Sequence, residues 1–311
     1  MPRPADGRDG PRTRRPVPLR RAYPAGRPYS GRGTEGQTLA PTAAVDRLRL
    51  GDHVCWDFDD DDARLETIAR FVEGGIRAHH RVLYLTETDL PARLRTALRD
   101  RGVPVDELLA VGQLDPAARI AALADYVAAA RRDGYTGVRV VADMSGAAGA
   151  ADAIERMAWF EANLNPVFTG GRVMAICLYD RRVFTAAELS RLGPAHPATA
   201  RPQDDPATWA PLLRAVRLPE GSGLRLVGAA DAANRYAVAA LLGWLVGDAV
   251  RAGRAALLDL AGLQFADVAA AEAMVAAGRA VPAGLRLTGC RPEIGQLITL
   301  VGGAGMLDRT A

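Results

Sequence analysis

Residues 51–86, GDHVCWDFDDDDARLETIARFVEGGIRAHHRVLYLT, hold the pattern that decides the fold of this chain. A mainly apolar run before Asp57 is followed by an acidic turn, a segment with helical spacing of apolar residues, and a second apolar run at 81–86. A strand, a helix and a second strand of this length are what two parallel neighbouring strands require. The stretch therefore predicts a βαβ unit.

The turn after the first strand has the wrong chemistry for binding phosphate. It consists of Asp57, Phe58 and the aspartates at 59–62. A phosphate-binding turn at this position points backbone N–H groups and a cation at the ligand. The sequence has 39 Lys and Arg residues, and all of them are Arg, so neither a phosphate-loop lysine nor a Schiff-base lysine exists. We expect this unit to repel a triphosphate unless a metal ion lies between them.

The same alternation of strand and helix continues to about residue 200. It predicts an α/β fold whose sheet is mostly parallel, with helices on both faces. The expected strands after the first unit are 107–111, which is weak, 138–143 and 172–178; the expected helices are 90–101, 115–133, 151–164, which should stop near Asn165 and Pro166, and a short one that begins with a capping box at 185–188.

Polar side chains follow three of these strands where each one ends. Ligands of open α/β sheets bind at the carboxyl ends of the strands, which here carry Asp57, Asp143, and Tyr179 with Asp180. His196, on a later loop, can return to the same edge. Cys55 and Cys177 would line the apolar floor of such a pocket. The alternatives are that both cysteines are ordinary core residues and that Asp143 caps a helix.

Four ordered segments of this region resemble one family. They are residues 51–87, the EANLNPVF segment at 161–168, the AICLYDRRVF segment at 175–184 and the turn at 195–197. Together they resemble the MEDS domain, the methanogen/methylotroph sensory domain, a relative of RecA/KaiC-type ATPase cores. The resemblance implies a module that senses small hydrocarbon derivatives. The ligand-binding residues it implies are His53, Cys55, Trp56, Cys177, Tyr179, Asp180 and His196.

A second, smaller unit is expected after a Pro- and Asp-rich linker at 201–219. Its order is β-α-β-α-β-α, with strands at 223–228, 255–260 and 285–289 and helices at 234–252, 267–278 and 292–301. The segments LRLVGAAD at 224–231, LLDLAGLQFADVAAAEAM at 257–274 and LTGCRPEI at 287–294 resemble a STAS domain. That resemblance implies docking on an anti-sigma factor through residues around Asp231, Asp267 and Val268. Val268 stands where phosphorylated members carry Ser or Thr, so switching by phosphorylation is not expected.

The N-terminal segment and the cysteines limit where in the cell the protein can be expected. Residues 1–43 hold nine Arg against three acids and are rich in Pro and Gly, so we expect a disordered tail. No segment has the length of uncharged apolar sequence that spans a membrane, and no export signal is visible. Three widely spaced cysteines favour a reducing cytoplasmic setting, and no zinc-type spacing or cofactor motif is visible.

These observations predict a regulatory protein rather than an enzyme. Residues 44–200 would bind a small molecule, and residues 220–311 would dock on a protein partner such as an anti-sigma factor. Nucleic acid is not an expected partner. The alternative is a degenerate RecA-like nucleotide-binding protein with weak NTPase activity, in which the aspartates at 59–62 hold Mg²⁺.

Overall fold

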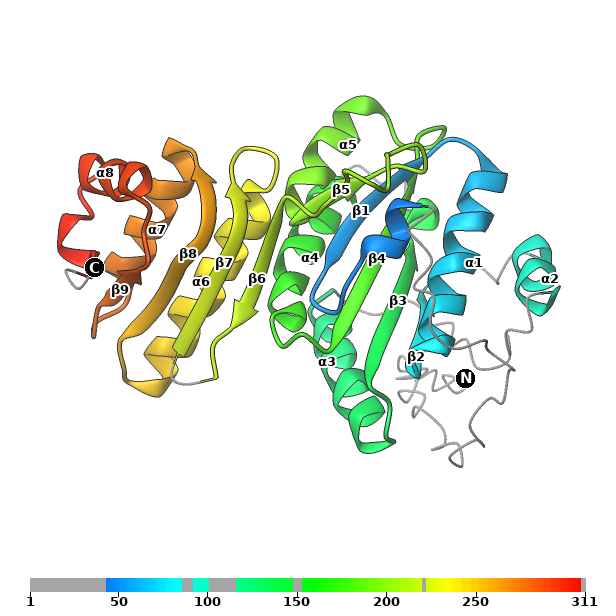
Figure 1. Cartoon of the computed structure of the whole chain (residues 1–311), viewed down its shortest axis with the longest axis horizontal. Helices are drawn as coiled ribbons and strands as arrows, with labels where there is room; N and C mark the ends of the chain where they lie inside the picture. Colours follow the sequence, from blue (N-terminus) through cyan, green and yellow to red (C-terminus); the bar gives the residue numbers. More distant parts are fainter. Residues whose placement is uncertain (1–42, 86–91, 101–115, 148–152, 220–221, 309–311) are drawn as a thin grey trace, which may run out of the picture. The chain divides into compact units, whose positions relative to one another are not determined.

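The computed structural model describes residues 43–85, 92–100, 116–147, 153–219 and 222–308, which contain two sheets and their helices (Figure 1). The predicted tail at 1–43, the weak strand at 107–111 and the first residue of the predicted helix at 115 lie outside the described residues or at their margin.

The first sheet has five strands in the order β2-β3-β4-β1-β5, and every neighbouring pair is parallel. Helices α1 and α2 pack on one face, and helices α3, α4 and α5 pack on the other (Figure 1). The prediction of a mostly parallel α/β sheet with helices on both faces is confirmed. The elements are β1 His53–Phe58, α1 Asp61–Arg77, β2 His80–Leu85, α2 Ala92–Asp100, α3 Pro116–Arg132, β3 Gly137–Asp143, α4 Ala153–Phe168, β4 Val173–Asp180, α5 Ala186–Leu192 and β5 Ala198–Ala200, with 3-10 turns η1 Ala44–Arg47, η3 Ser145–Ala147 and η4 Gly193–Ala195.

Local hydrogen bonds explain where two of these helices begin. The Asp60 side chain accepts from the N–H of Ala63 and caps α1, so one of the turn aspartates serves the helix. Thr185 and Glu188 form the predicted capping box of α5.

Helix α4 continues past the point where the sequence predicts its end. Pro166 lies inside the helix, and its missing N–H would leave the carbonyl of Ala162 without a partner. The side-chain amide of Asn165 donates to that carbonyl at 2.9 Å. The predicted stop near Asn165 and Pro166 is therefore wrong, because Asn165 supplies the hydrogen bond that Pro166 removes.

The second sheet has four strands in the order β6-β7-β8-β9. β6 is antiparallel to β7, and the other neighbours are parallel. All six predicted elements are present, but residues 213–217 of the expected linker form strand β6. The elements are β6 Leu213–Arg217, β7 Ser222–Ala230, α6 Arg235–Ala252, β8 Ala256–Ala266, α7 Val268–Ala280, β9 Leu285–Thr288 and α8 Pro292–Leu300, with the 3-10 turn η5 Ala304–Met306.

Candidate functional site: a buried polar cluster

A group of polar side chains is buried between the first sheet and helix α4. Side chains of a strand alternate between the two faces, so His53 and Cys55 of β1 share one face. Strand β4 runs parallel to β1 with Cys177 opposite Cys55, which places Cys177 and Tyr179 on that face too. Trp56 points to the other face and packs in the core formed with α1. The pleat of the sheet thus separates Trp56 from the polar residues.

Helix α4 contributes Glu161 and Asn165 to this group. Residues four apart lie on the same side of a helix, and both of these side chains are buried. The amide nitrogen of Asn165 donates to the carbonyls of Glu161, Ala162 and Ala195 at 3.1, 2.9 and 2.9 Å. Asn165 therefore joins the end of α4 to the η4 turn that precedes His196.

One carboxylate oxygen lies at the centre of the group. Glu161 Oε2 is 3.1 Å from His53 Nε2, 3.4 Å from His196 Nε2 and 3.5 Å from Cys177 Sγ. The Tyr179 hydroxyl donates to Glu161 Oε1 at 2.9 Å, and His53 Nε2 lies 3.3 Å from Cys177 Sγ. None of these five residues is more than 1% exposed. We call His53, Glu161, Cys177 and His196 the buried cluster.

The outer nitrogens of both histidines are held by acceptors. His196 Nδ1 lies 3.1 Å from the Leu192 carbonyl, which can only accept. His53 Nδ1 lies 2.9 Å from Asn165 Oδ1, whose own amide nitrogen is turned toward three carbonyls. Each Nδ1 therefore carries a proton, and in a neutral imidazole each Nε2 presents a lone pair to the carboxylate. His196 Nε2 is buried without a hydrogen-bond partner.

The cluster lacks positive charge to balance its acceptors. Burial lowers the pKa of His53, and the neighbouring His196 lowers it further. Burial raises the pKa of Glu161, but the charge and hydrogen bonding of His196 and His53 outweigh it and leave this pKa below its ordinary value. The two directions conflict, because a carboxylate stabilised by imidazolium needs protons that burial disfavours on His53. We favour the neutral imidazole, since desolvation acts first on a fully buried cation.

The cysteines beside this carboxylate are protonated thiols. Burial raises the pKa of Cys177 well above its ordinary value, and the charge of Glu161 adds to the effect. Cys55 is affected in the same way, with burial first and Asp57 second. A group that removed the Cys177 proton would have to supply positive charge.

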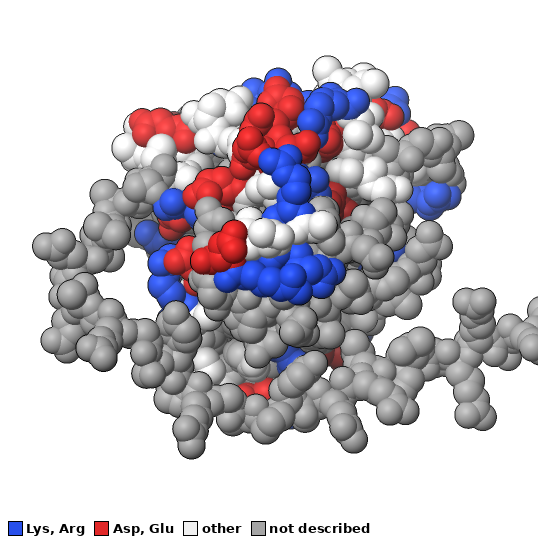
Figure 2. All heavy atoms as spheres, turned by 90° about the vertical axis from the view of Figure 1, so that its right-hand side faces the viewer, with Lys and Arg blue, Asp and Glu red and all other residues white. Residues whose placement is uncertain are grey.

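The carboxyl ends of the strands carry a different kind of polar site. Each acid there is matched by an arginine: Asp57 lies 3.0 Å from Arg201, and Asp180 lies 2.7 Å from Arg182. Asp143 bonds to Arg64 and to the Tyr84 hydroxyl. We call these pairs the edge network; it also includes Asp59 with Arg181, Asp61 with Arg182 and Asp62 with Arg93. Figure 2 shows the side that carries α1 and α2, where acidic and basic side chains are interspersed.

This pairing corrects the electrostatic argument from the sequence. The acidic turn at 57–62 was expected to repel a triphosphate, but four of its aspartates face arginines and Asp60 caps a helix. The carboxylates are thus compensated within the fold. Charge repulsion at this edge does not by itself exclude an anion.

The nine residues expected to bind a ligand separate into three groups. His53, Cys177, Tyr179 and His196 come together around Glu161, and Cys55 lies beside Cys177 in the same apolar core. Trp56 lies on the opposite face of the sheet. The last group, Asp57, Asp143 and Asp180, belongs to the edge network. The structure does not bring all nine into one pocket.

Two central residues, Glu161 and Asn165, were not among the predicted site residues. Both lie in the EANLNPVF segment, and each is a polar residue on the side of α4 that faces the sheet. The sequence did contain a signal for Glu161, because a buried helix face rarely carries a carboxylate without partners. Short-range spacing could not reveal the cluster, since His53 lies 108 positions from Glu161 and 124 positions from Cys177.

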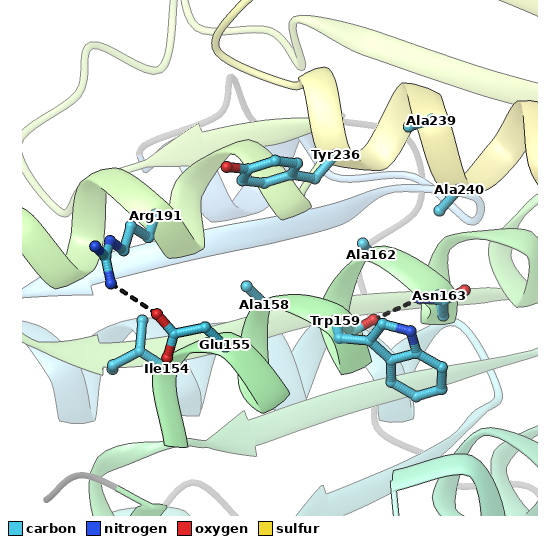
Figure 3. Close-up of a pocket in the computed structure, with 10 residues that line it drawn as sticks. All are labelled: Ile154, Glu155, Ala158, Trp159, Ala162, Asn163, Arg191, Tyr236, Ala239 and Ala240. Carbon is cyan, nitrogen blue, oxygen red and sulfur yellow. Dashed lines mark hydrogen bonds and ion pairs between the residues drawn. The ribbon is translucent and has the colours of Figure 1, made fainter. Parts of the chain in front are cut away.

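A separate pocket of ≈ 530 Å³ lies on the other flank of α4 (Figure 3). Ala158 and Ala162 of α4 line it opposite Ala239 and Ala240 of α6, and Tyr236 closes one side. Its ion pair, Arg191 with Glu155, is exposed. This pocket contains none of the buried cluster and none of the edge network.

Comparison with known families gives a match for the first part of the chain. Residues 52–197 match the model of the MEDS domain, described as the methanogen/methylotroph, DcmR sensory domain. The match spans every member of the buried cluster, and the predicted MEDS resemblance is confirmed over this range. Residues 220–311 fall outside it. No curated protein is a significant match to the sequence.

Two solved structures from Pyrococcus horikoshii OT3 show weak likeness. One comes from a structural study of that organism; it is 11% identical, with a TM-score of 0.36, and covers 51% of this chain and 85% of its own. The other is a KaiC-like protein, 10% identical, with a TM-score of 0.34, and covers 49% and 70%. Scores this low assign no fold family, so the RecA/KaiC-like relationship stays a prediction. Among the described residues, no helix combines the length and apolar character that a membrane crossing requires.

Proposed function

We propose that this protein is a non-enzymatic regulator in which residues 44–200 sense a small molecule and residues 220–311 transmit the signal to a protein partner. The observation that carries the proposal is the convergence of three segments, all within the MEDS match, on one buried carboxylate of α4.

The surroundings of the cluster suit a small, largely apolar ligand with one polar group. The core next to Cys55 and Cys177 includes the thioethers of Met144 and Met157 and the ring of Phe184. Apolar walls with a few convergent polar groups are typical of small-molecule sites. Small hydrocarbon derivatives, such as short alcohols or haloalkanes, fit this chemistry.

Hydrogen bonds connect the cluster to the second sheet through strand β6. Arg214 of β6 makes two hydrogen bonds, of 2.6 and 3.0 Å, to the buried carboxylate of Asp52, the residue before His53. The N–H of Leu213 donates to the carbonyl of Pro197, the residue after His196, at 3.1 Å. A ligand that shifts either histidine thus acts on a neighbour bonded to β6, which is the differential contact that coupling requires.

The first test is ligand binding by the full chain. We expect a panel of short alcohols, haloalkanes and amines to contain a compound that raises the melting temperature of the wild-type chain. Glu161→Gln should abolish that shift, while Glu155→Gln, on the exposed side of the same helix, should keep it. A compound that stabilises wild type and Glu161→Gln equally, or no stabilising compound at all, would contradict sensing at the cluster.

The partner side of the proposal rests on the STAS resemblance. Asp267 caps α7 by accepting from the N–H of Ala270 at 2.8 Å, as the sequence predicts, and Val268 beside it is 54% exposed. Asp231 closes the turn after β7 by accepting from the N–H of Ala233.

A purified anti-sigma factor should bind the full chain and lose affinity with Val268→Arg, but not with Val250→Arg on α6, where the valine is 49% exposed. Equal effects of both variants would contradict docking at α7.

The nucleotide-binding alternative is supported by one observation, the five arginines at the edge of the sheet. Calorimetry of the full chain with ATP and Mg²⁺ separates it from sensing. Submillimolar binding that is lost with Arg64→Gln and unaffected by Glu161→Gln would favour the nucleotide alternative.

A further inference from the structure

We propose that His53, Glu161, Cys177 and His196 bind a divalent transition-metal ion in a closed four-ligand site, with Zn²⁺ the best match. The proposal does not depend on small-molecule sensing, because it rests on the arrangement of the ligand atoms alone. Among the described residues, these four are the group of His, Cys, Asp and Glu side chains that could hold a metal ion, and their donor atoms all lie within 4.8 Å of one another.

Most separations between the ligand atoms are close to those of a tetrahedron around one ion. Zinc bonds of about 2.0–2.3 Å to nitrogen, oxygen and sulfur place neighbouring ligand atoms of a tetrahedron about 3.3–3.8 Å apart. Four of the six separations in the cluster are 3.1, 3.3, 3.4 and 3.5 Å. A modest expansion of the group would therefore admit the ion, with one atom from each side chain as a ligand.

The hydrogen bonds around the cluster are those of a metal site. A histidine that binds a metal through one nitrogen usually donates its other N–H to a carbonyl or carboxylate. His196 does so to the Leu192 carbonyl and His53 to Asn165 Oδ1. Tyr179 holds the second carboxylate oxygen of Glu161. Every outer contact thus directs a lone pair inward, and His196 Nε2 has no other partner.

Charge balance favours an ion rather than a shared proton. Two neutral imidazoles, one carboxylate and one thiolate carry a charge of −2, which a divalent ion cancels. The whole site would then be neutral, as full burial requires. On binding, the Cys177 thiol loses its S–H proton to solvent and the sulfur bonds to the metal, with no change of oxidation state. Thiolate, imidazole and carboxylate together suit zinc, and Co²⁺ is a close chemical substitute.

Metal analysis and Co²⁺ spectroscopy of the full chain test the site. Purified without chelator or reconstituted with Zn²⁺, the wild-type chain should hold close to one equivalent of metal. Replacing it with Co²⁺ should give the visible bands of tetrahedral cobalt and a sulfur-to-cobalt charge-transfer band in the near ultraviolet. These readouts need no variant, so they remain decisive if a substitution prevents folding.

Two cysteine variants identify the thiolate. Cys177→Ser should lose the charge-transfer band, whereas Cys55→Ser, the neighbouring buried cysteine on β1, should keep it. Asn165→Ala removes the acceptor of the His53 N–H and should weaken metal binding by about 10–100-fold, the usual effect of an outer-contact residue. His79→Gln with His80→Gln should leave the stoichiometry unchanged.

Three results would overturn the assignment. One is a wild-type chain that takes up neither Zn²⁺ nor Co²⁺ stoichiometrically after reconstitution. Another is a charge-transfer band that survives Cys177→Ser or disappears with Cys55→Ser. The third is loss of the metal in the His79 and His80 variant, which would place it between the end of α1 and the start of β2.

Discussion

The buried cluster and the edge network both take residues from β1 and β4, but their polar groups are balanced in different ways. In the edge network every described acid has an arginine beside it, and these arginines are 17–70% exposed although Asp57, Asp143 and Asp180 are buried. In the buried cluster the acceptors outnumber the donor protons, and each member is at most 1% exposed. The same strand β4 supplies Cys177 to one group and Asp180 to the other. The comparison teaches that burial, rather than residue type, decides which polar group dominates stability and function.

The largest effect is expected when a buried and an exposed carboxylate are each removed from helix α4. Glu161→Ala should lower the free energy of unfolding by about 1–3 kcal/mol for each of two buried donors, the Tyr179 hydroxyl and the Cys177 thiol, because both lose their acceptor. Glu155→Ala, whose ion pair with Arg191 is 62% exposed on both sides, should cost below about 1 kcal/mol. Urea unfolding in the presence of a chelator measures both. Equal costs would show that burial is not the deciding variable.

Asn165→Ala tests whether the loss of an uncharged buried hydrogen-bonding group also lowers stability. We expect a loss of about 1–3 kcal/mol, because carbonyls of α4 and η4 lose their donor. Asn163→Ala, which removes one exposed hydrogen bond to the Trp159 carbonyl, should change stability far less.

A second substitution separates the hydrogen bond from Asn165 to the Ala162 carbonyl from the other hydrogen bonds of Asn165. Adding Pro166→Ala restores an N–H that can bond to the Ala162 carbonyl. The double variant Asn165→Ala, Pro166→Ala should therefore recover part of the stability lost by Asn165→Ala. A purely additive double-mutant cycle would disprove that Asn165 replaces the proline hydrogen bond.

Local patterns in the sequence predicted the elements well. Apolar periodicity located the strands around Val54 and Val140, and capping chemistry located the starts of α5 and α7 at Thr185 and Asp267. These signals lie within a few residues of the feature that they predict. The predicted end of α4 was wrong, because the rule that proline ends a helix takes no account of a preceding asparagine that replaces the missing N–H donor.

The candidate site could be predicted only in part, because it depends on long-range packing. Cys177 and His196 were expected at one site because strand ends meet at a sheet edge, and His53 was expected there only from the MEDS resemblance. Glu161 was missed because strand-end reasoning gives no place to a helix that covers the sheet. Strand β6 was missed for a related reason: a Pro- and Asp-rich stretch resembles a linker until its partner β7 is known.

His80 is intermediate between the two regions, since it is half-buried and lies next to a cation. Burial lowers its pKa to about 4, with the charges of Arg139 and then His79 adding to the shift. The unfolded state then binds a proton near pH 6.5 that the folded state accepts only near pH 4. Stability should therefore be intact above pH 6.5 and decrease as the pH falls from 6.5 toward 4.

His80→Asn should flatten this pH dependence and leave stability at pH 7.5 nearly unchanged. Asparagine offers an acceptor near the Nδ1 position, which now accepts from Arg139 Nε at 3.3 Å, and it does not titrate. Urea unfolding at several pH values measures the slope for both chains, and His79→Asn is the control one residue away. An unchanged slope in His80→Asn would show that His80 is not the group responsible.

The smallest effect is expected in the edge network, at the pair of Arg181 and Asp59. Their side chains lie 2.6 Å apart but are 35% and 55% exposed. Solvated pairs of this kind contribute about 0.2–1 kcal/mol, and salt reduces the contribution further, because the Debye length falls to about 3 Å at 1 M. Arg181→Gln should therefore cost below about 1 kcal/mol at low salt and have no measurable effect in 1 M NaCl. Glu161→Ala should keep its full cost at both salt concentrations, because no counterion reaches a carboxylate enclosed by protein. A salt-independent loss in Arg181→Gln would mean that the edge network is as important to stability as the buried cluster.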